Sequence, residues 1–133
     1  PLLNAGIFAL SGNAPHWEKW QELITKALKK GRVFTAEQLS LGVLTYLEGY
    51  KVEPLPSWCN WLCEITPHWD EQRKLFVEPS LPHHPISVLH LCGFDEMRVD
   101  RSVTEGIETT DGGIITMTLR YPHLNGEEAL MSS

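Results

Sequence analysis

Residues 13–31 of the chain read NAPHWEKWQELITKALKKG. Asn13 suits an N-cap position, Pro15 is tolerated in a first helical turn, and Gly31 ends the pattern. Lysines gather at the C-terminal end of the segment, where cations interact favourably with the helix dipole. Apolar residues recur every three or four positions, at Trp17, Trp20, Ile24, Ala27 and Leu28. This spacing predicts an amphipathic helix.

A second helix is predicted immediately after the first. The sequence Thr35-Ala-Glu-Gln38 has the form of a capping box, in which the Thr35 hydroxyl accepts the Gln38 amide proton and the Gln38 side chain returns to the Thr35 amide. Leu39, Val43 and Leu47 then share one helix face. We expect this helix to run to about residue 48.

Short strands are expected on both sides of the helical pair, at residues 5–10, 51–55, 86–92 and 113–121. Residues 86–92 are the clearest, because they are apolar except for Ser87 and His90. Residues 113–121 alternate in polarity after a hairpin turn at residues 111–113, and residues 98–104 are a weaker strand candidate. Residues 56–85, rich in proline, are expected to be a long loop region with at most short helical turns. The predicted fold class is α/β, with two helices packed on a small mixed sheet.

Composition narrows the classes of function. The 133 residues are 42% hydrophobic, which is enough for one domain with a core. A net charge of -6 argues against a protein that holds nucleic acid or an anionic membrane mainly by charge. The three cysteines cannot all pair within the chain, so we expect a reducing, cytoplasmic compartment. No apolar run approaches the roughly 18 residues of a membrane-spanning helix.

Four short motifs lie at the ends of the predicted elements. They are Asn4-Ala5-Gly6, Glu37-Gln38, Asn60-Trp61 and His90-Leu91-Cys92-Gly93. Each has an ordinary structural explanation when it is taken alone: a tight chain entry, a helix cap, a turn and a core histidine. It is their order along the chain that suggests a function.

In this order the motifs resemble the C-terminal half of a GT-A glycosyltransferase. The resemblance covers about residues 1–93 and is closest to the retaining glycogenin-like and galactosyltransferase-like enzymes of glycosyltransferase family 8. It implies that residues 1–123 form the sugar- and acceptor-side portion of the domain, that residues 124–133 are a flexible tail, and that a nucleotide-binding half precedes residue 1. The implied reaction transfers a sugar from a nucleotide-diphosphate donor to an acceptor, with Mn²⁺ or Mg²⁺ as cofactor.

The resemblance also implies roles for individual residues. His90 becomes a metal ligand, and Gly93 lets the backbone approach a phosphate closely. Glu37 and Gln38 become catalytic residues that hydrogen-bond the donor sugar or support its oxocarbenium-like anomeric carbon.

Five further residues are implied to bind substrate. Asn4, Gly6 and Asn60 come from the motifs that surround the sugar. Trp58 and Trp61 offer flat apolar faces to the C–H groups of the acceptor.

The sequence departs from the family pattern at three points. Glu37 stands where the family usually has Asp. A Lys-Pro-Trp clamp for the diphosphate is replaced by Gly93-Phe-Asp-Glu-Met97, in which Asp95 and Glu96 would repel the diphosphate and leave Arg98 as the nearest cation. The Asp-x-Asp that supplies the other metal ligands is absent from these residues. We therefore expect the 133 residues to carry half of a site and to be inactive alone.

A zinc site is an alternative interpretation of the same region. Several potential ligands fall within a short stretch: Cys59, Cys63, His68, His83, His84, His90 and Cys92. Their spacing fits no paired zinc-binding unit, which places this interpretation below a purely structural one.

The more serious alternative is a non-catalytic α/β binding or interaction module derived from such a domain. Exposed tryptophans and the acidic stretch at residues 95–111 could equally form an interface. A homo-oligomer formed through exposed apolar surface is compatible with either hypothesis. Nucleophilic catalysis of the Ser-His-Asp or Cys-His type has no motif to support it.

Overall fold

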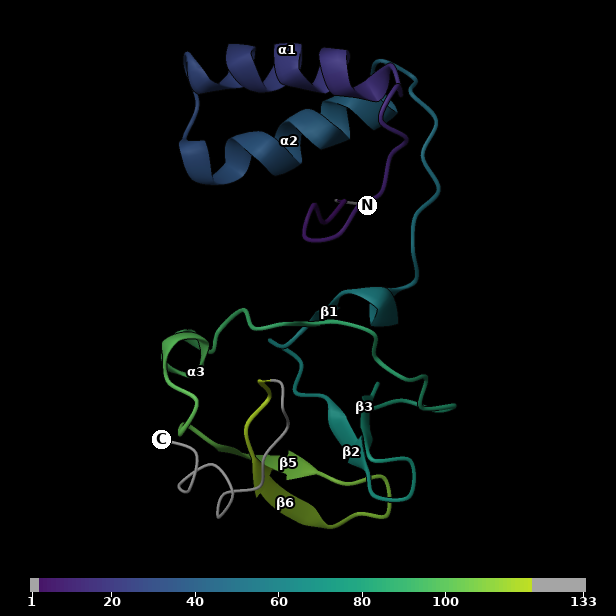
Figure 1. The fold of residues 1–133 in the computed structure, drawn as a ribbon, viewed down its shortest axis with the longest axis vertical. Helices are drawn as coiled ribbons and strands as arrows, with labels where there is room; N and C mark the ends of the chain where they lie inside the picture. Colours follow the sequence, from purple (N-terminus) through teal and green to yellow (C-terminus); the bar gives the residue numbers. More distant parts are fainter. Residues whose placement is uncertain (1–2, 121–133) are drawn as a thin grey trace. The chain divides into compact units, whose positions relative to one another are not determined.

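The computed structural model describes residues 3–120 (Figure 1), and these residues form a mixed α/β structure. The chain divides into two compact units, Pro1–Leu55 and Pro56–Ser133. The two longer helices belong to the first unit, and the strands belong to the second. Each unit is described by itself.

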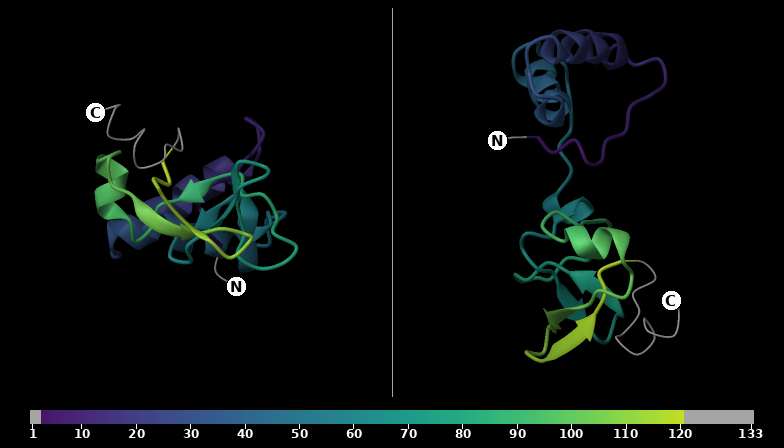
Figure 2. Two further views of the ribbon diagram at one scale, coloured as in Figure 1. Left: turned by 90° about the horizontal axis from the view of Figure 1, so that it is seen from below. Right: turned by 90° about the vertical axis from the view of Figure 1, so that its left-hand side faces the viewer.

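The first unit is a pair of helices, α1 (His16–Leu28) and α2 (Val33–Tyr46), which lie side by side in Figures 1 and 2. Trp20 of α1 is buried against α2, where Ala36, Ser40 and Leu44 are buried. The indole Nε1 of Trp20 donates a hydrogen bond of 3.0 Å to the Ser40 hydroxyl, which satisfies the polar atom of a buried tryptophan. Both predicted helices are therefore confirmed.

The predicted helix caps are wrong. The N-cap of α1 is Pro15 and that of α2 is Arg32, and neither makes a side-chain capping bond. Because α2 begins before Thr35, the Thr35 hydroxyl already lies inside the helix and points back to the Arg32 carbonyl. α1 ends at Leu28, three residues before Gly31. The Gly31 amide donates to the Ala27 carbonyl at 2.6 Å, and a β-carbon at this position would lie 2.8 Å from the same oxygen, which favours glycine here.

The predicted strand at residues 5–10 does not form. The described residues of this segment pair with no strand, and Phe8 packs edge-on against Trp17 and Trp20, with ring centroids at 5.9 and 4.9 Å. An apolar run becomes a strand only where another strand completes its hydrogen bonds. Here Phe8 packs against tryptophans of helix α1 instead.

The second unit contains strand pairs rather than one sheet. Strand β1 (Trp61–Leu62) pairs in parallel with β4 (Leu89–His90). Strands β2 (His68–Asp70) and β3 (Leu75–Val77) form one antiparallel pair, and β5 (Glu105–Glu108) and β6 (Ile114–Met117) form another. A 3₁₀ helix, η1 (Ser57–Cys59), and a short helix, α3 (Asp95–Val99), complete the unit.

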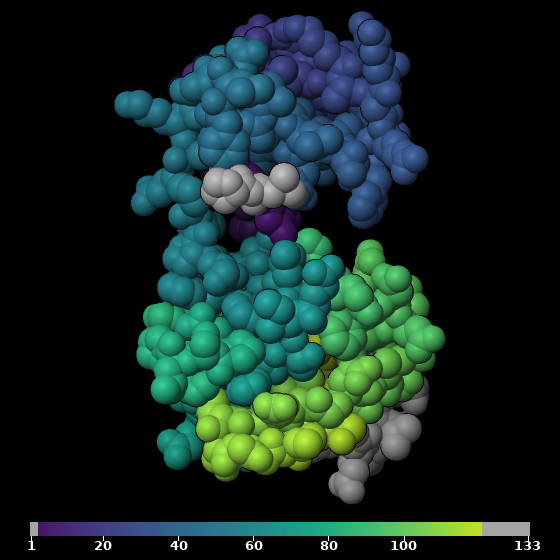
Figure 3. All heavy atoms as spheres, turned by 180° about the vertical axis from the view of Figure 1, so that it is seen from behind, coloured from purple at the N-terminus to yellow at the C-terminus, as the bar shows by residue number. Residues whose placement is uncertain are grey.

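One apolar core holds these pairs together. The Thr110 amide donates to the Trp69 carbonyl at 3.0 Å, and the Ile86 amide donates to the Phe76 carbonyl at 2.9 Å, so bonds outside the strands connect the pairs. The atoms of residues 56–120, teal to yellow, form a continuous body in Figure 3. The buried core residues are Cys63, Trp69, Phe76, Met97, Ile107, Met117 and Leu119.

Several strand predictions for the second half need correction. Residues 51–55 form no strand, because Pro54 and the following Pro56 have no amide donor and residues 51–57 are exposed. The strand at residues 86–92 shortens to β4, and the supposed loop at residues 56–85 contains β1, β2 and β3. The strand candidate at residues 98–104 does not form: its first two residues end α3, whose buried Met97 belongs to the core, and residues 100–104 have no regular structure before β5. The hairpin turn is confirmed, and the Thr109 amide donates to the Gly113 carbonyl at 2.9 Å. The strand predicted at residues 113–121 shortens to β6. Residue 121 and the predicted tail at residues 124–133 lie outside the described residues.

Candidate functional site

Two of the four sequence motifs are neighbours in the second unit because β1 and β4 pair. The Trp61 amide donates to the Val88 carbonyl at 2.9 Å, and the Cys63 amide donates to the His90 carbonyl at 3.0 Å. In this register Leu62 lies opposite His90, so Asn60 is about 7 Å along the strand direction from His90. The parallel pair therefore brings Asn60-Trp61 and His90-x-x-Gly93 together.

His90 points away from the core. Its neighbours Leu89 and Leu91 pack against the buried cluster, and side chains alternate between the two faces of a strand. The His90 side chain is consequently exposed and can reach a ligand. Within residues 3–120, however, no three His, Cys, Asp or Glu side chains form a group that could hold a metal ion.

The zinc alternative meets a further difficulty at Cys63. Burial in the core raises the pKa of the Cys63 thiol to about 12, and the neighbouring Cys92 adds to the effect. Zinc is bound by the thiolate form, which such a pKa makes costly near neutral pH. Cys63 is only 1% exposed and belongs to the buried core cluster.

Gly93 occupies a backbone conformation that favours glycine, with φ of 81°. Helix α3 follows at once, and Asp95 and Glu96 lie in its first turn. The Arg98 Nη1 donates to the Asp95 carboxylate at 2.9 Å. The cation nearest to this motif in the sequence is therefore already paired with an acidic neighbour.

The two candidate tryptophans have different surroundings. The Trp61 Nε1 donates to the Ile65 carbonyl at 2.7 Å, and its ring packs against the core. Trp58 stacks on the His84 ring, with centroids 3.9 Å apart and planes inclined by 15°. Trp61 is therefore fixed by the fold, whereas the half-buried Trp58 has a stacked partner on one face.

The other predicted site residues belong to the first unit. The Asn4 Oδ1 accepts the Gly6 amide at 2.7 Å, so this side chain caps its own turn. Glu37 is exposed and Gln38 is half-buried on α2. The structure thus groups Trp58, Asn60, Trp61, His90 and Gly93 within one unit, and the remaining four residues lie in the other.

Glu78 was not identified from the sequence, although it is one of the most constrained acidic residues. It is only 8% exposed. Its carboxylate Oε1 hydrogen-bonds the His84 Nδ1 and accepts the His84 amide at 3.3 Å. The hydrogen bond from the His84 ring is the main cause that lowers the pKa of the Glu78 carboxyl. Nothing in the local pattern indicates this pairing, because it depends on the loop after β3 folding back.

Asp70 ends β2 and organises the turn to β3. Its Oδ1 accepts the amides of Gln72 and Arg73 at 3.0 and 2.8 Å, and its Oδ2 accepts the Arg73 Nε at 2.6 Å. These bonds, led by that from the Arg73 amide, lower the pKa of the Asp70 carboxyl. The ionised carboxylate is therefore the form that stabilises the turn.

Replacing Asp70 with asparagine is expected to lower the thermal stability at neutral pH. A lowered pKa in the folded state contributes stability above the ordinary carboxyl pKa, about 4, and this stability is lost as the pH falls below it. Asp70→Asn should therefore also flatten the loss of Tm on acidification from about pH 5 downward. Calorimetric melting curves across this range test it, with the exposed Glu71→Gln as the matched control. Equal acid sensitivity in Asp70→Asn and the wild type would contradict the assignment.

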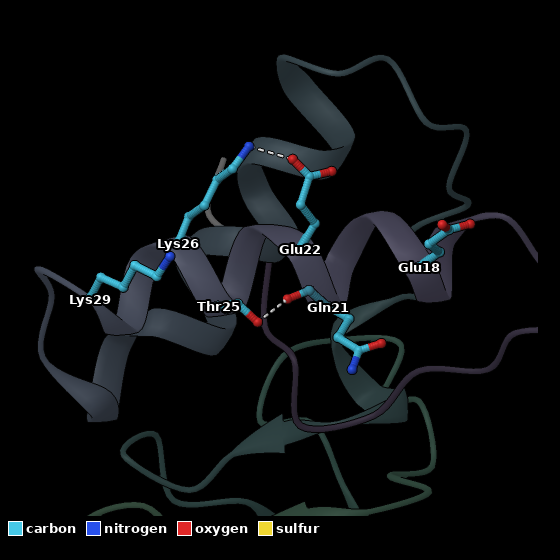
Figure 4. Close-up of a pocket in the computed structure, with 6 residues that line it drawn as sticks. All are labelled: Glu18, Gln21, Glu22, Thr25, Lys26 and Lys29. Atoms are coloured by element: carbon cyan, nitrogen blue, oxygen red, sulfur yellow. Dashed lines mark hydrogen bonds and ion pairs between the residues drawn. The ribbon is translucent and has the colours of Figure 1, made fainter.

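A depression over α1 is lined by charged and polar side chains rather than by predicted site residues (Figure 4). Within it the Lys26 ammonium pairs with the Glu22 carboxylate, and the Thr25 hydroxyl donates to the Gln21 carbonyl at 2.8 Å. These are contacts one helical turn apart on an exposed surface. This hollow is the outer face of a helix and offers no converging groups.

A second hollow lies in the other unit and is also free of the predicted site residues. Its lining combines apolar residues, among them Leu75, Phe76 and Leu119, with the basic residues Lys74, Arg101 and Arg120.

None of the helices among residues 3–120 has the length and apolar character needed to cross a membrane. The chain matches no protein-family model, no curated protein and no solved structure.

Proposed function

We propose that the protein takes part in metal-dependent transfer of a sugar from a nucleoside-diphosphate donor to an acceptor. The observation that carries the proposal is the parallel pairing of β1 with β4, which makes neighbours of Asn60-Trp61 and His90-x-x-Gly93. These motifs are far apart in sequence, and both belong to the ordered set that resembles GT-A glycosyltransferases. The GT-A fold and retention of configuration remain part of the proposal.

In this proposal the second unit contributes three kinds of contact. The exposed His90 imidazole is one ligand of a divalent cation such as Mn²⁺. The backbone at Gly93, with its φ of 81°, approaches a phosphate. Trp58 contacts the acceptor and Asn60 contacts the sugar. Trp61, whose ring packs against the core, holds this segment of the chain in place.

The first unit contributes polar groups. Glu37 and Gln38, and likewise Asn4 and Gly6, keep in this proposal the sugar-binding roles that the resemblance implies for them. A carboxylate and an amide together can both accept and donate to sugar hydroxyls.

The fit to a metal is limited to one donor. An exposed imidazole is a normal ligand, but the described residues hold no group of three donor side chains. When bound, the cation would neutralise the diphosphate leaving group. The remaining ligands would have to come from residues other than those described.

Titration calorimetry of the full-length protein with UDP-glucose and UDP-galactose, with and without Mn²⁺, tests the proposal. We expect binding that requires the metal and that weakens at least about tenfold in His90→Ala, by the loss of one ligand. His68→Ala is the matched control, because His68 is an imidazole of the same unit that lies outside the motifs. Absence of metal-dependent binding, or an unchanged affinity in His90→Ala, would overturn the proposal.

The second candidate is a non-catalytic interaction module. It is favoured by the large apolar side chains exposed on α2, where Phe34 is 97% and Val33 79% exposed. Such exposure is typical of surfaces that meet a partner. This candidate predicts no heat with either UDP-sugar, so the same titration separates the two functions.

A further inference from the structure

Trp58 and His84 form the closest ring stack of the second unit. Their ring centroids are 3.9 Å apart, and their planes are inclined by only 15°. Trp58 lies in η1, and His84 lies in the loop between β3 and β4. The backbones are tied together as well, because the Ser87 amide donates to the Trp58 carbonyl at 2.8 Å. The stack is thus held by main chain as well as by side chains.

His84 is itself held in place by Glu78. The Glu78 carboxylate bonds both the Nδ1 and the amide of His84, and the Glu78 amide donates to the His84 carbonyl at 3.0 Å. The neighbouring His83 Nδ1 lies 2.9 Å from the Glu78 carbonyl oxygen. Since the carboxylate accepts, the Nδ1 of His84 carries the proton in this bond. The imidazole therefore has little freedom to rotate.

Glu78 connects this stack to the core. It follows directly after Phe76 and Val77 of β3, which are 3% and 0% exposed. A carboxylate as buried as that of Glu78 is costly to leave unpaired, so its bond to His84 is strongly favoured. A continuous series of contacts runs from the core through Glu78 and His84 to the indole of Trp58.

We infer that Glu78 and His84 are positioning residues that orient Trp58 as a one-sided platform for a sugar ring of the acceptor. This inference rests on the proposed function. His84 occupies one face of the indole, so a ligand that stacks on Trp58 has to use the opposite face. A ring held in advance loses less conformational freedom when a ligand binds, which strengthens binding. Loss of the stacked imidazole should weaken sugar binding and lower the stability of the unit, because Glu78 loses its side-chain partner. The unit should stay folded, because the His84 amide still donates to the Glu78 carboxylate at 3.3 Å.

The test uses the full-length protein labelled with 5-fluorotryptophan and observed by ¹⁹F NMR. Trp58→Phe assigns the Trp58 resonance. Maltose, lactose and cellobiose serve as probes, and the variants are His84→Leu, which removes the ring, and His84→Phe, which restores a stacking partner. His68→Leu is the matched control, because its ring lies outside the stack with Trp58.

We expect at least one disaccharide to shift the Trp58 resonance. His84→Leu should move this resonance in the sugar-free protein and weaken disaccharide binding about three- to tenfold, as expected for one aromatic pair. His84→Phe should recover most of the affinity, and His68→Leu should change neither quantity. This combination distinguishes a positioning role from a merely structural one. If His84 were only structural, the sugar affinity would not change in parallel with the Trp58 resonance.

Three results would overturn the inference. An unchanged Trp58 resonance in His84→Leu would show that the stack does not exist in solution. A moved resonance with unchanged sugar affinity would make the stack purely structural. If no disaccharide shifted the Trp58 resonance, Trp58 would not be a sugar-binding platform. The proposed transfer from a nucleotide-sugar donor would still be tested separately, by the calorimetric titration with UDP-sugars and Mn²⁺.

Discussion

Replacing Phe76 with alanine is expected to lower the free energy of unfolding by about 3–5 kcal/mol, the range for removal of a buried aromatic ring. Phe76 is 3% exposed and packs edge-on against Trp69, with ring centroids 5.0 Å apart. Its carbonyl also accepts the Ile86 amide, so a shift of this residue disturbs a second segment. Urea denaturation measures the loss, and hydrogen exchange of the peptide covering residues 68–77 locates it.

The matched control for Phe76→Ala is Phe34→Ala, because Phe34 is 97% exposed. The same chemical change at an exposed position should alter the stability by no more than about 0.5 kcal/mol. Equal losses in the two variants would mean that Phe76 is not a core residue. A small loss for Phe76→Ala alone would show that the neighbouring side chains fill the cavity.

Replacing Leu44 with alanine is expected to cost about 2–5 kcal/mol and to unfold the helical pair of the first unit. Leu44 belongs to α2, is 0% exposed, and lies in the unit where α1 and α2 pack together. A core this small supplies only about 3–5 kcal/mol, so the cavity would remove most of its stability. Far-UV circular dichroism should show the loss of helix, and hydrogen exchange of residues 33–46 should accelerate.

Leu47→Ala provides the comparison within the same segment, since Leu47 lies just after α2 and is 79% exposed. It should retain the helical signal of the wild type. If Leu44→Ala kept the helical signal as well, the packing of the two helices at this position would be wrong.

The helices could be predicted from the sequence, but their caps could not. A helix makes its hydrogen bonds within one segment, so the spacing of Trp17, Trp20 and Ile24 was sufficient information for α1. A cap depends on the one residue at which the helix starts. Since α2 begins at Val33, Thr35 and Gln38 both lie inside the helix, and their amides do not need the side-chain partners that a capping box provides.

The strands were predicted less well because each needs a partner from elsewhere in the chain. Residues 5–10 are largely apolar and residues 51–55 alternate in polarity, as strands do, yet no strand pairs with either segment. Conversely, β1 and β2 lie in a region whose sequence has little periodicity. They form because β4 completes the hydrogen bonds of β1 and β3 completes those of β2. Pairing is a long-range property that a local pattern does not contain.

The candidate site shows the same division. The sequence alone identified residues of the types that suit sugar and metal chemistry, among them His90, Asn60 and Trp58. Alternation along a strand also predicts that the His90 side chain points to the face opposite that of its apolar neighbours. The tertiary structure decided that Asn60-Trp61 and His90 are neighbours, that Cys63 is a core thiol, and that Trp58 stacks on His84. Local spacing determines which faces of a segment are apolar, whereas contacts between distant segments are set by the backbone pairing and packing of the whole unit.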